Sequence, residues 1–383
     1  MIKVLFLILD FRLAGVEKII LYLVNRLDRN RFQPVIVAVN ASGPLLVSVP
    51  DDVPVFNLRG EQGNMLQFPW KVIRYSYMLR KIIMDIKPSI VISGSWFTSI
   101  LSSCLHKSIR ATGGKLILAF HIPVTNFIIS SSFANIFAPV KKLVTSVLFN
   151  RAEKIIAISH TMKQDLITKL HILSTKISEI YNGIDVTAIS AASMEANDIN
   201  LDFPYLVAVG RLENVKGHDF LIRSFSLVSN SIPHNLIIVG EGSCCDYLQK
   251  MVMDLGLEER IMFTGGLSNP YPIMKNADFL VLSSLWEAFP FVLLEALALK
   301  VPVIATASDG PIEILDHGKY GTLVPVGDET ALAEAICRYA VNPEERLRFN
   351  AQSTTRVEGF SLDRMVKEYE DLFINLCDEA VLM

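Results

Sequence analysis

Two glutamates stand eight positions apart in the segment EAFPFVLLE, at Glu287 and Glu295. Pro290 suits the first turn of a helix, so we expect Glu287 in the loop before that helix and Glu295 two turns inside it. Carboxylates accept hydrogen bonds from hydroxyl groups, so the pair could hold the two ends of one elongated ligand. The plainer alternative for Glu287 is a capping carboxylate. Glu295 lies on an otherwise apolar helix, where a lone acid requires a partner.

A second cluster, GRLENVKGHD (210–219), follows a predicted strand and ends where a helix begins. Arg211 offers a planar fork of donors and Lys216 a point charge, so together they could clamp a diphosphate. A pair of ordinary surface cations is the alternative. In the first half, Gly15 of AGVEK (14–18) lets the amides of a helix start approach a phosphate. The full GxGxxG fingerprint is absent, which argues against an NAD enzyme.

The histidines and cysteines do not show the spacing of a metal site. There is no HxH, HExxH or CxxC pattern and no Asp-x-Asp between strands, so we expect no metal and no cofactor. Most of the six other histidines, His106, His160, His171, His218, His234 and His317, are expected at the surface or at caps. His121 differs, because it follows a strand inside an uncharged stretch. Five cysteines without paired spacing favour a reducing cytoplasm.

Strand-like and helix-like segments alternate along the whole chain, and the series restarts after Asn182. Short apolar runs without period-two alternation are typical of parallel sheets covered on both faces. The pattern therefore predicts an α/β protein with two doubly wound, Rossmann-like domains, 1–182 and 183–361. A linker is expected over Gly183–Phe203. The chain is predicted to be helical from Asp328 onward, with Leu362–Leu376 the candidate for a helix, in 362–383, that crosses back to the first domain.

The predicted strands of the first half are Lys3–Leu9, Pro34–Val39, Ser89–Ile92, Leu116–Phe120, Lys154–Ile158 and Lys176–Tyr181, with helices at Val16–Leu27 and Leu66–Met84. Those of the second half are Pro204–Val209, Asn235–Val239, Arg260–Phe263, Phe279–Leu282 and Pro302–Ala305.

Charge is distributed unevenly between the halves. Met1–Asn182 holds 22 Lys and Arg against 10 Asp and Glu, a charge of +12, and the remainder holds 14 against 29, a charge of −15, which together give −3. A basic first half is suited to an anionic partner. No nucleic-acid motif or basic stripe with interleaved aromatics is present, so a membrane surface is the preferred partner.

The 25 residues between Lys115 and Lys141 contain no charged side chain. That length matches a spanning helix, but Pro123, Pro139 and several polar residues argue against a span. We expect a strand, a loop and an interfacial helix flanked by lysines, on the inner face of the cell membrane. An ordinary core helix is the alternative. If the helix is interfacial, high salt should weaken membrane association.

The glutamate pair with seven residues between its members resembles the EX7E signature of the retaining glycosyltransferases of family 4. Other segments agree in order: AGVEK, His121 after a strand, NGID (182–185), GRLENVKGHD, VGEG (239–242) and SDGPIEIL (308–315). The resemblance covers nearly the whole chain and implies the GT-B fold, of the type found in bacterial envelope, capsule and O-antigen synthesis. The usual double glycine of the first turn is Ala14-Gly15 here, so the first position has less conformational freedom. We expect this to adjust the loop conformation without abolishing the loop's role.

Carried over by position, the resemblance implies these roles. Arg211 and Lys216 would bind the donor diphosphate, Glu295 the ribose, and Glu287 the transferred sugar with help from amides near Phe289, Pro290 and Phe291. Gly266 and Leu267 would lie against the nucleobase. In the N-terminal, acceptor-binding domain, Gly15 would meet the phosphates and the acceptor, and His121 would contact the sugar near the reacting centre.

The implied reaction is hexosyl transfer from a nucleoside diphosphate sugar, with UDP preferred, to a glycan or lipid-linked saccharide acceptor. The family retains anomeric configuration, and the leaving phosphate is expected to help deprotonate the acceptor. Three alternatives stay open: a sugar-nucleotide epimerase, a phosphorylase, and a degenerate chain that acts as a membrane-associated binding subunit.

Overall fold

The computed structural model describes all residues except 13–14, 59–67, 121–133, 197–198, 200 and 379–383. The chain divides into two compact units. The first comprises Met1–Gly183 together with Leu362–Met383, and the second comprises Ile184–Ser361. Each unit is built on its own parallel sheet.

The first unit contains a seven-stranded sheet in the order β3-β2-β1-β4-β5-β6-β7. Its strands are β1 (Ile2–Ile8), β2 (Phe32–Ala38), β3 (Val55–Asn57), β4 (Ile90–Ser93), β5 (Lys115–Phe120), β6 (Lys154–Ala157) and β7 (Ile177–Glu179). Its helices are α1 (Gly15–Arg26), α2 (Phe68–Ile86), α3 (Trp96–Cys104), α4 (His106–Ala111), α6 (Ala134–Phe149), α7 (His160–Leu170) and α16 (Leu362–Asp378). All strand pairs are parallel, and the central strands are almost fully buried. Helices therefore cover both faces of this sheet.

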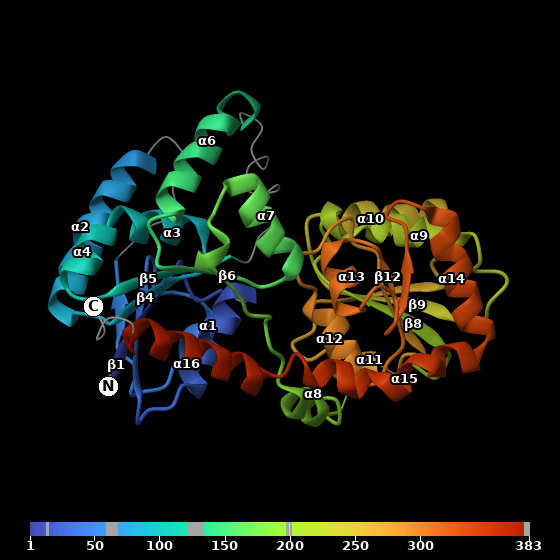
Figure 1. Ribbon diagram of the computed structural model, residues 1–383. Helices are drawn as coiled ribbons and strands as arrows, with labels where there is room; N and C mark the ends of the chain where they lie inside the picture. Colours follow the sequence, from blue (N-terminus) through green and yellow to red (C-terminus); the bar gives the residue numbers. More distant parts are fainter. Residues whose placement is uncertain (13–14, 59–67, 121–133, 197–198, 200, 379–383) are drawn as a thin grey trace. The chain divides into compact units, whose positions relative to one another are not determined.

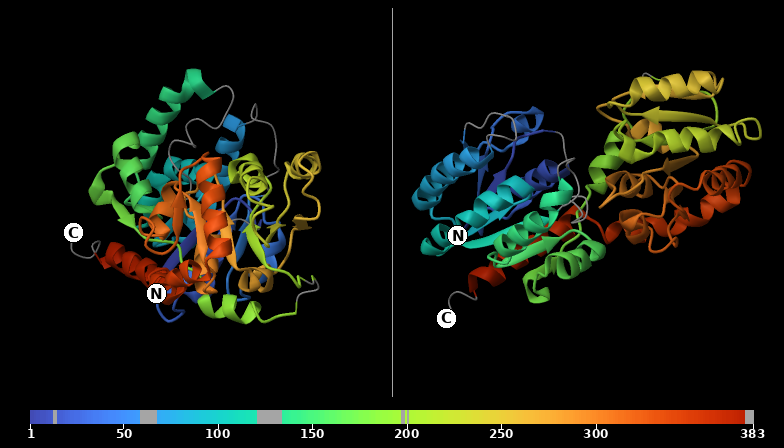
Figure 2. Two further views of the ribbon diagram at one scale, coloured as in Figure 1. Left: turned by 90° about the vertical axis from the view of Figure 1, so that its right-hand side faces the viewer. Right: turned by 90° about the horizontal axis from the view of Figure 1, so that it is seen from above.

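The helices of the first unit form two layers (Figures 1 and 2). One layer holds α2, α3, α4 and α6, which pack against one another in a continuous series. The other holds α1 and α16, and α16 also packs against β1. The last helix of the chain is thus part of the first unit, where Phe373 meets the ring of Phe32 at 6.0 Å between centroids.

The second unit has a six-stranded sheet in the order β10-β9-β8-β11-β12-β13. Its strands are β8 (Tyr205–Val209), β9 (Asn235–Val239), β10 (Ile261–Gly265), β11 (Phe279–Leu282), β12 (Val303–Thr306) and β13 (Thr322–Val324). Its helices are α8 (Val186–Ala192), α9 (His218–Ser226), α10 (Cys245–Asp254), α11 (Tyr271–Asn276), α12 (Phe291–Ala298), α13 (Asp309–Ile314), α14 (Glu329–Val341) and α15 (Pro343–Glu358). A buried cluster that includes Phe220, Phe225, Phe279 and Tyr339 forms its core.

The prediction of a linker over Gly183–Phe203 was wrong for its first part. Helix α8 forms there, capped by Asp185, whose carboxylate accepts from the Ala188 amide at 2.9 Å. The helix packs on α11 and α12. Its short, small-residue sequence VTAISAA carries little apolar periodicity, which is why the pattern did not reveal it.

The uncharged stretch falls on β5, on α6 and on residues 121–133, which lie outside the described part of the chain, as do His121 and Ala14. The strand and the helix at its two ends are confirmed. None of the helices built from described residues has the length and apolar character needed to traverse a bilayer.

Because α16 packs into the core of the first unit, we predict that removing the contacts of its Phe373 ring destabilises that unit. Phe373 is fully buried and also meets Tyr369, with 5.9 Å between ring centroids. Phe373→Ala should lower the free energy of unfolding by about 3–5 kcal/mol, measured by chemical denaturation. Lys367→Ala, on the exposed side of the same helix, is the matched control. Equal effects of the two variants would show that α16 is not part of this unit's core.

Candidate functional site

The charged residues predicted to do chemistry gather at the carboxyl ends of the strands in the second unit. Arg211 and Lys216 follow β8, Glu287 lies between β11 and α12, and Glu295 is in α12. Ligands of open parallel sheets bind along this edge. The geometry of the site can therefore be built from the loops after β8 and β11.

Lys216 and Glu287 form an ion pair across these two loops, with 2.5 Å between Nζ and Oε1. The lysine side chain is 21% exposed and the glutamate side chain 13%, so water screens the pair only partly. The buried Ser284 hydroxyl donates to the same Oε1 at 2.8 Å. The other carboxylate oxygen, Oε2, accepts no hydrogen bond from a residue within the described ranges.

Glu287 is not the capping carboxylate that was considered for it. Helix α12 begins at Phe291, and its cap residue, Pro290, makes no side-chain capping bond. The first amides of α12 thus have no side-chain acceptor at the cap position. They are available for a negatively charged group at the positive end of the helix dipole.

Backbone contacts fix the loop after β8 against the loop after β11. Leu285 donates its amide to the Val215 carbonyl at 2.8 Å, and the Ser283 hydroxyl donates to the Lys216 carbonyl at 3.0 Å. Gly217, with φ of 61°, lies so close that a Cβ there would be 2.3 Å from the Ser283 carbonyl oxygen. Only glycine permits this approach, so the backbone that carries Lys216 is held in place.

A second close approach positions Arg211. A Cβ on Gly240, at the end of β9, would lie 1.9 Å from the Gly210 carbonyl oxygen. The Leu212 amide in turn donates to the Glu241 carbonyl at 2.8 Å. The Arg211 side chain is exposed and makes no hydrogen bond or ion pair with any residue whose position is described. It is a cation on a rigid loop with its donors open to a ligand.

His218 is an exception to the expectation that most of these histidines lie at the surface or at caps. It is the first residue of α9 and is 5% exposed. Its ring and the Lys216 side chain both lie near Gly210, where an added Cβ would be 4.0 Å from His218 Cε1 and 3.9 Å from Lys216 Cδ. Burial, and then the Lys216 charge, lower the pKa of His218 to about 4. Its ring is therefore neutral at pH 7, and a neutral imidazole adds no repulsion next to the lysine.

His234 is a second exception, since it is buried and contacts Asp278, with 3.1 Å between Nε2 and Oδ2. His160, His171 and His317 are exposed as predicted. No three His, Cys, Asp or Glu side chains in the described ranges gather as metal ligands would.

Glu295 has the partner that its apolar helix requires, because the Tyr271 hydroxyl donates to its Oε1 at 3.2 Å. Tyr271 is the first residue of α11, and no sequence pattern distinguishes it. Phe289 is buried between the rings of Phe291 and Phe360, with centroids 5.8 and 5.7 Å away. The packing of the Phe289 ring therefore stabilises the loop between β11 and α12.

Gly266 and Leu267 follow β10, and the Gly266 amide donates to Glu241 Oε1 at 3.1 Å. The carboxylate of Glu241 thus links the loops after β9 and β10. Sequence reasoning did not single out Glu241, although it lies within the VGEG segment.

In the first unit, Gly15 is the exposed first residue of α1. Nearby, Arg12 pairs with Asp10, and the guanidinium holds the pKa of that carboxyl below its usual value. Glu17 is buried, and burial raises its pKa. His121 cannot be placed relative to these groups, because it lies outside the described residues.

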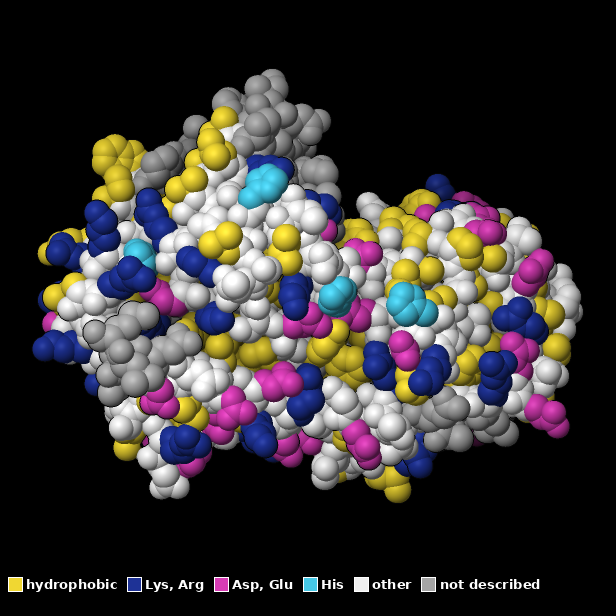
Figure 3. Space-filling model, in the orientation of Figure 1, with side chains coloured by type: hydrophobic (Ala, Val, Ile, Leu, Met, Phe, Trp, Pro, Cys, Tyr) yellow, Lys and Arg dark blue, Asp and Glu magenta, His cyan; other side chains and the backbone are white. Residues whose placement is uncertain are grey.

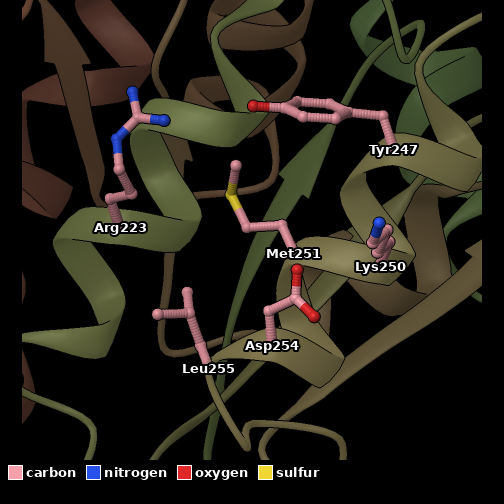
Figure 4. A pocket seen from close by; sticks show the side chains of 6 residues that line it. All are labelled: Arg223, Tyr247, Lys250, Met251, Asp254 and Leu255. Carbon is pink, nitrogen blue, oxygen red and sulfur yellow. The ribbon is translucent and has the colours of Figure 1, made fainter.

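A separate surface pocket of about 400 Å³ lies between α9 and α10 (Figure 4). It is lined by Arg223, Tyr247, Lys250, Met251, Asp254 and Leu255. None of the predicted site residues lines it. Arg223 is engaged by Glu329 at 2.5 Å and by Asp219 at 3.1 Å, so its charge is already neutralised.

Comparison with known proteins gives a consistent result for both halves of the chain. Residues 13–188 match the family model described as Glycosyltransferase Family 4, and residues 190–356 match Glycosyl transferases group 1. A Campylobacter jejuni protein, N-acetylgalactosamine-N,N'-diacetylbacillosaminyl-diphospho-undecaprenol 4-alpha-N-acetylgalactosaminyltransferase, is 29% identical over 230 residues. That alignment covers 60% of this chain and 62% of the relative.

Two further comparisons extend over most of the chain. An uncharacterized glycosyltransferase of Methanocaldococcus jannaschii is 26% identical over 358 residues, covering 84% of this chain and 87% of that protein. The crystal structure of Anabaena HepE in complex with UDP superimposes with a TM-score of 0.77 at 21% identity, over 98% of this chain and all of that one. The similarity to the HepE structure shows a shared fold.

The buried histidine makes the second unit sensitive to acid. The folded-state pKa of about 4 lies below the unfolded value near 6.5, so the unfolded state binds more protons between these values. Stability should therefore fall by up to about 3 kcal/mol as pH drops from 6.5 to 4. His218→Asn should remove this dependence, as measured by denaturation at several pH values.

The control is His317→Asn, at an exposed histidine whose φ of 56° asparagine also tolerates. This variant should keep the wild-type pH dependence. A ring titration of His218 near pH 6.5, seen by NMR, would contradict the assignment.

Proposed function

Because this chain belongs to the glycosyltransferases of the group 1 and family 4 type, with the GT-B fold, we propose that it transfers a sugar from a nucleoside diphosphate sugar to a saccharide acceptor. The observation that carries the proposal is the Lys216–Glu287 pair at the carboxyl edge of the second sheet. The pair places a cation beside a carboxylate, so that the cation can bind a phosphate and the carboxylate can bind a hydroxyl group of the same ligand.

The donor diphosphate would bind between Arg211, Lys216 and the start of α12. Arg211 has its donors open, and the first α12 amides have no side-chain cap. Lys216 makes one bond to Glu287, and an ammonium group has three donors. These groups stabilise the charge that develops on the diphosphate as the anomeric C–O bond breaks.

The sugar and the nucleoside would be held by the two glutamates. Glu287 uses only Oε1 for Lys216 and Ser284, so Oε2 can accept a hydroxyl of the transferred sugar. Glu295, oriented by Tyr271, would accept from the ribose. Gly266 and Leu267 would lie against the base. Because the HepE structure contains UDP, UDP-sugars are the first donors to test.

The first unit would present the acceptor, with Gly15 and His121 near the reacting centre. We propose retention of anomeric configuration, with the leaving phosphate accepting the proton of the acceptor hydroxyl. A lipid-linked or other envelope saccharide is the proposed acceptor class. The name of the Campylobacter relative includes a saccharide linked to diphospho-undecaprenol. The first half of this chain has 22 basic and 10 acidic residues, a net charge of +12, which suits an anionic acceptor.

The proposal predicts that neutralising Glu287 strongly slows transfer without unfolding the protein. Glu287→Gln keeps the shape of the side chain but weakens its bond to Lys216 and to a sugar hydroxyl. We expect kcat for release of nucleoside diphosphate to fall about 100-fold or more. The assay would supply UDP-sugars with lipid-linked saccharides extracted from the native membrane.

Glu259→Gln is the matched control, because Glu259 is an exposed glutamate of the same unit that lies before β10. It should retain full activity. Unchanged transfer by Glu287→Gln would refute the assignment of this site. Donor binding with no transfer to any acceptor would instead favour a binding subunit, and conversion of the donor without an acceptor would favour an epimerase.

A further inference from the structure

Helix α6 exposes more apolar surface than is usual for a surface helix. Its outward face carries Val140, Leu143, Val144 and Val147, at helical spacing, and Leu143 is 64% exposed. A surface helix normally presents its polar face to water. Here the helix presents a continuous apolar stripe.

The inward side of the same helix holds polar groups as well as the buried ring of Phe149. Thr145 is buried, and the Lys141 ammonium lies 5.3 Å from the centre of the Trp96 ring on α3. Burial lowers the pKa of Lys141. The helix thus turns a lysine toward the protein and leaves four aliphatic side chains outside, an arrangement that is favourable only if the outer face meets an apolar phase.

Helix α2 adds a second exposed stripe to the same layer of the unit. Trp70, Ile73 and Tyr77 follow one another at helical spacing, and the exposed fractions of Trp70 and Tyr77 are 77% and 73%. Arg80, Lys81 and Met84 continue the exposed side of the helix. Both α2 and α6 pack on α3, so the two stripes belong to one layer (Figure 1).

The layer is strongly basic as well as apolar. The sequences of α2, α4 and α6 contain four, two and two lysines or arginines, eight in all, against a single acid, Asp85; α3 has no charged residue. Yellow and dark blue side chains lie side by side over this part of the molecule, at the upper left of Figure 3. Apolar residues framed by cations are typical of surfaces that bind anionic membranes.

We propose that the exposed stripes of α2 and α6 form a docking surface for an anionic lipid bilayer, with Trp70, Tyr77 and Leu143 inserted among the lipid headgroups. Tryptophan and tyrosine favour the membrane–water interface because their rings are amphipathic. A symmetric contact with a second copy would bring like-charged layers together, which disfavours dimerisation here. The proposal concerns where the protein sits and does not depend on the transfer reaction.

Sequence patterns alone predicted membrane contact for part of this surface and did not indicate the rest. They indicated a membrane contact at the uncharged stretch that ends in α6. They did not identify Trp70, Ile73 or Tyr77, because alternating apolar and basic residues on α2 resemble an ordinary amphipathic helix until the exposed side is known.

The test is co-sedimentation of the full-length protein with vesicles. Wild-type protein should bind vesicles of phosphatidylglycerol and phosphatidylethanolamine, lose most of that binding in high salt, and bind pure phosphatidylcholine weakly. Trp70→Ala with Leu143→Ser should reduce partitioning onto the anionic vesicles about tenfold or more. Because both side chains are exposed, the double variant should fold normally and keep its nucleotide affinity.

Leu227→Ser with Val341→Ser is the matched control, with exposures of 60% and 61% on the second unit. This variant should bind vesicles like wild type. The proposal is overturned if wild-type protein does not bind anionic vesicles, or if the two double variants bind equally. It is also overturned if light scattering shows a dimer that only the Trp70 and Leu143 changes dissociate.

Discussion

A partly buried ion pair between Lys216 and Glu287 requires the loops after β8 and β11 of the second unit to be in contact. Two charges removed from water are stable only when they meet with good geometry and have further hydrogen bonds. Lys216 follows β8 and Glu287 follows β11, 71 positions apart in the chain. The two loops must therefore touch, which they do through the backbone at Gly217 and Ser283 and through the hydroxyl of Ser284. The neutral ring of His218 then fills the space beside the lysine without opposing its charge.

The charges of the two units suit different parts of the proposed reaction. The second unit is acidic overall and concentrates its few site cations at one sheet edge, where a diphosphate would need them. The first unit is basic and exposes apolar stripes on α2 and α6. A lipid-linked acceptor would fit this division, because the unit proposed to present the acceptor is also the one proposed to contact the membrane. Docking and transfer nonetheless rest on different residues and can fail separately.

Much of the fold followed from the sequence, because parallel strands buried on both faces give uninterrupted apolar runs. Eleven strands were expected and each is present with its ends shifted by at most two residues. The missed strands β3 and β13 have three residues each, too short for any period to show. Helix α8 was mistaken for linker because its residues are small. In the site, the types and spacing of Arg211, Lys216, Glu287 and Glu295 were informative, but Ser284, Tyr271 and His218 matter only through contacts made by folding. No sequence period encodes such contacts.

The central claim, that the edge of the second sheet is a nucleoside diphosphate site, is tested most directly by calorimetric titration with UDP, GDP and ADP. The wild-type protein should bind one of these nucleotides selectively. Lys216→Ala and Glu295→Ala should each weaken that binding about tenfold or more, since each removes a charge-assisted bond to the ligand. Lys250→Ala, in the separate pocket between α9 and α10, should leave it unchanged. Absence of binding to all three nucleotides, or an unchanged, wild-type affinity in the Lys216→Ala and Glu295→Ala variants, would contradict the account.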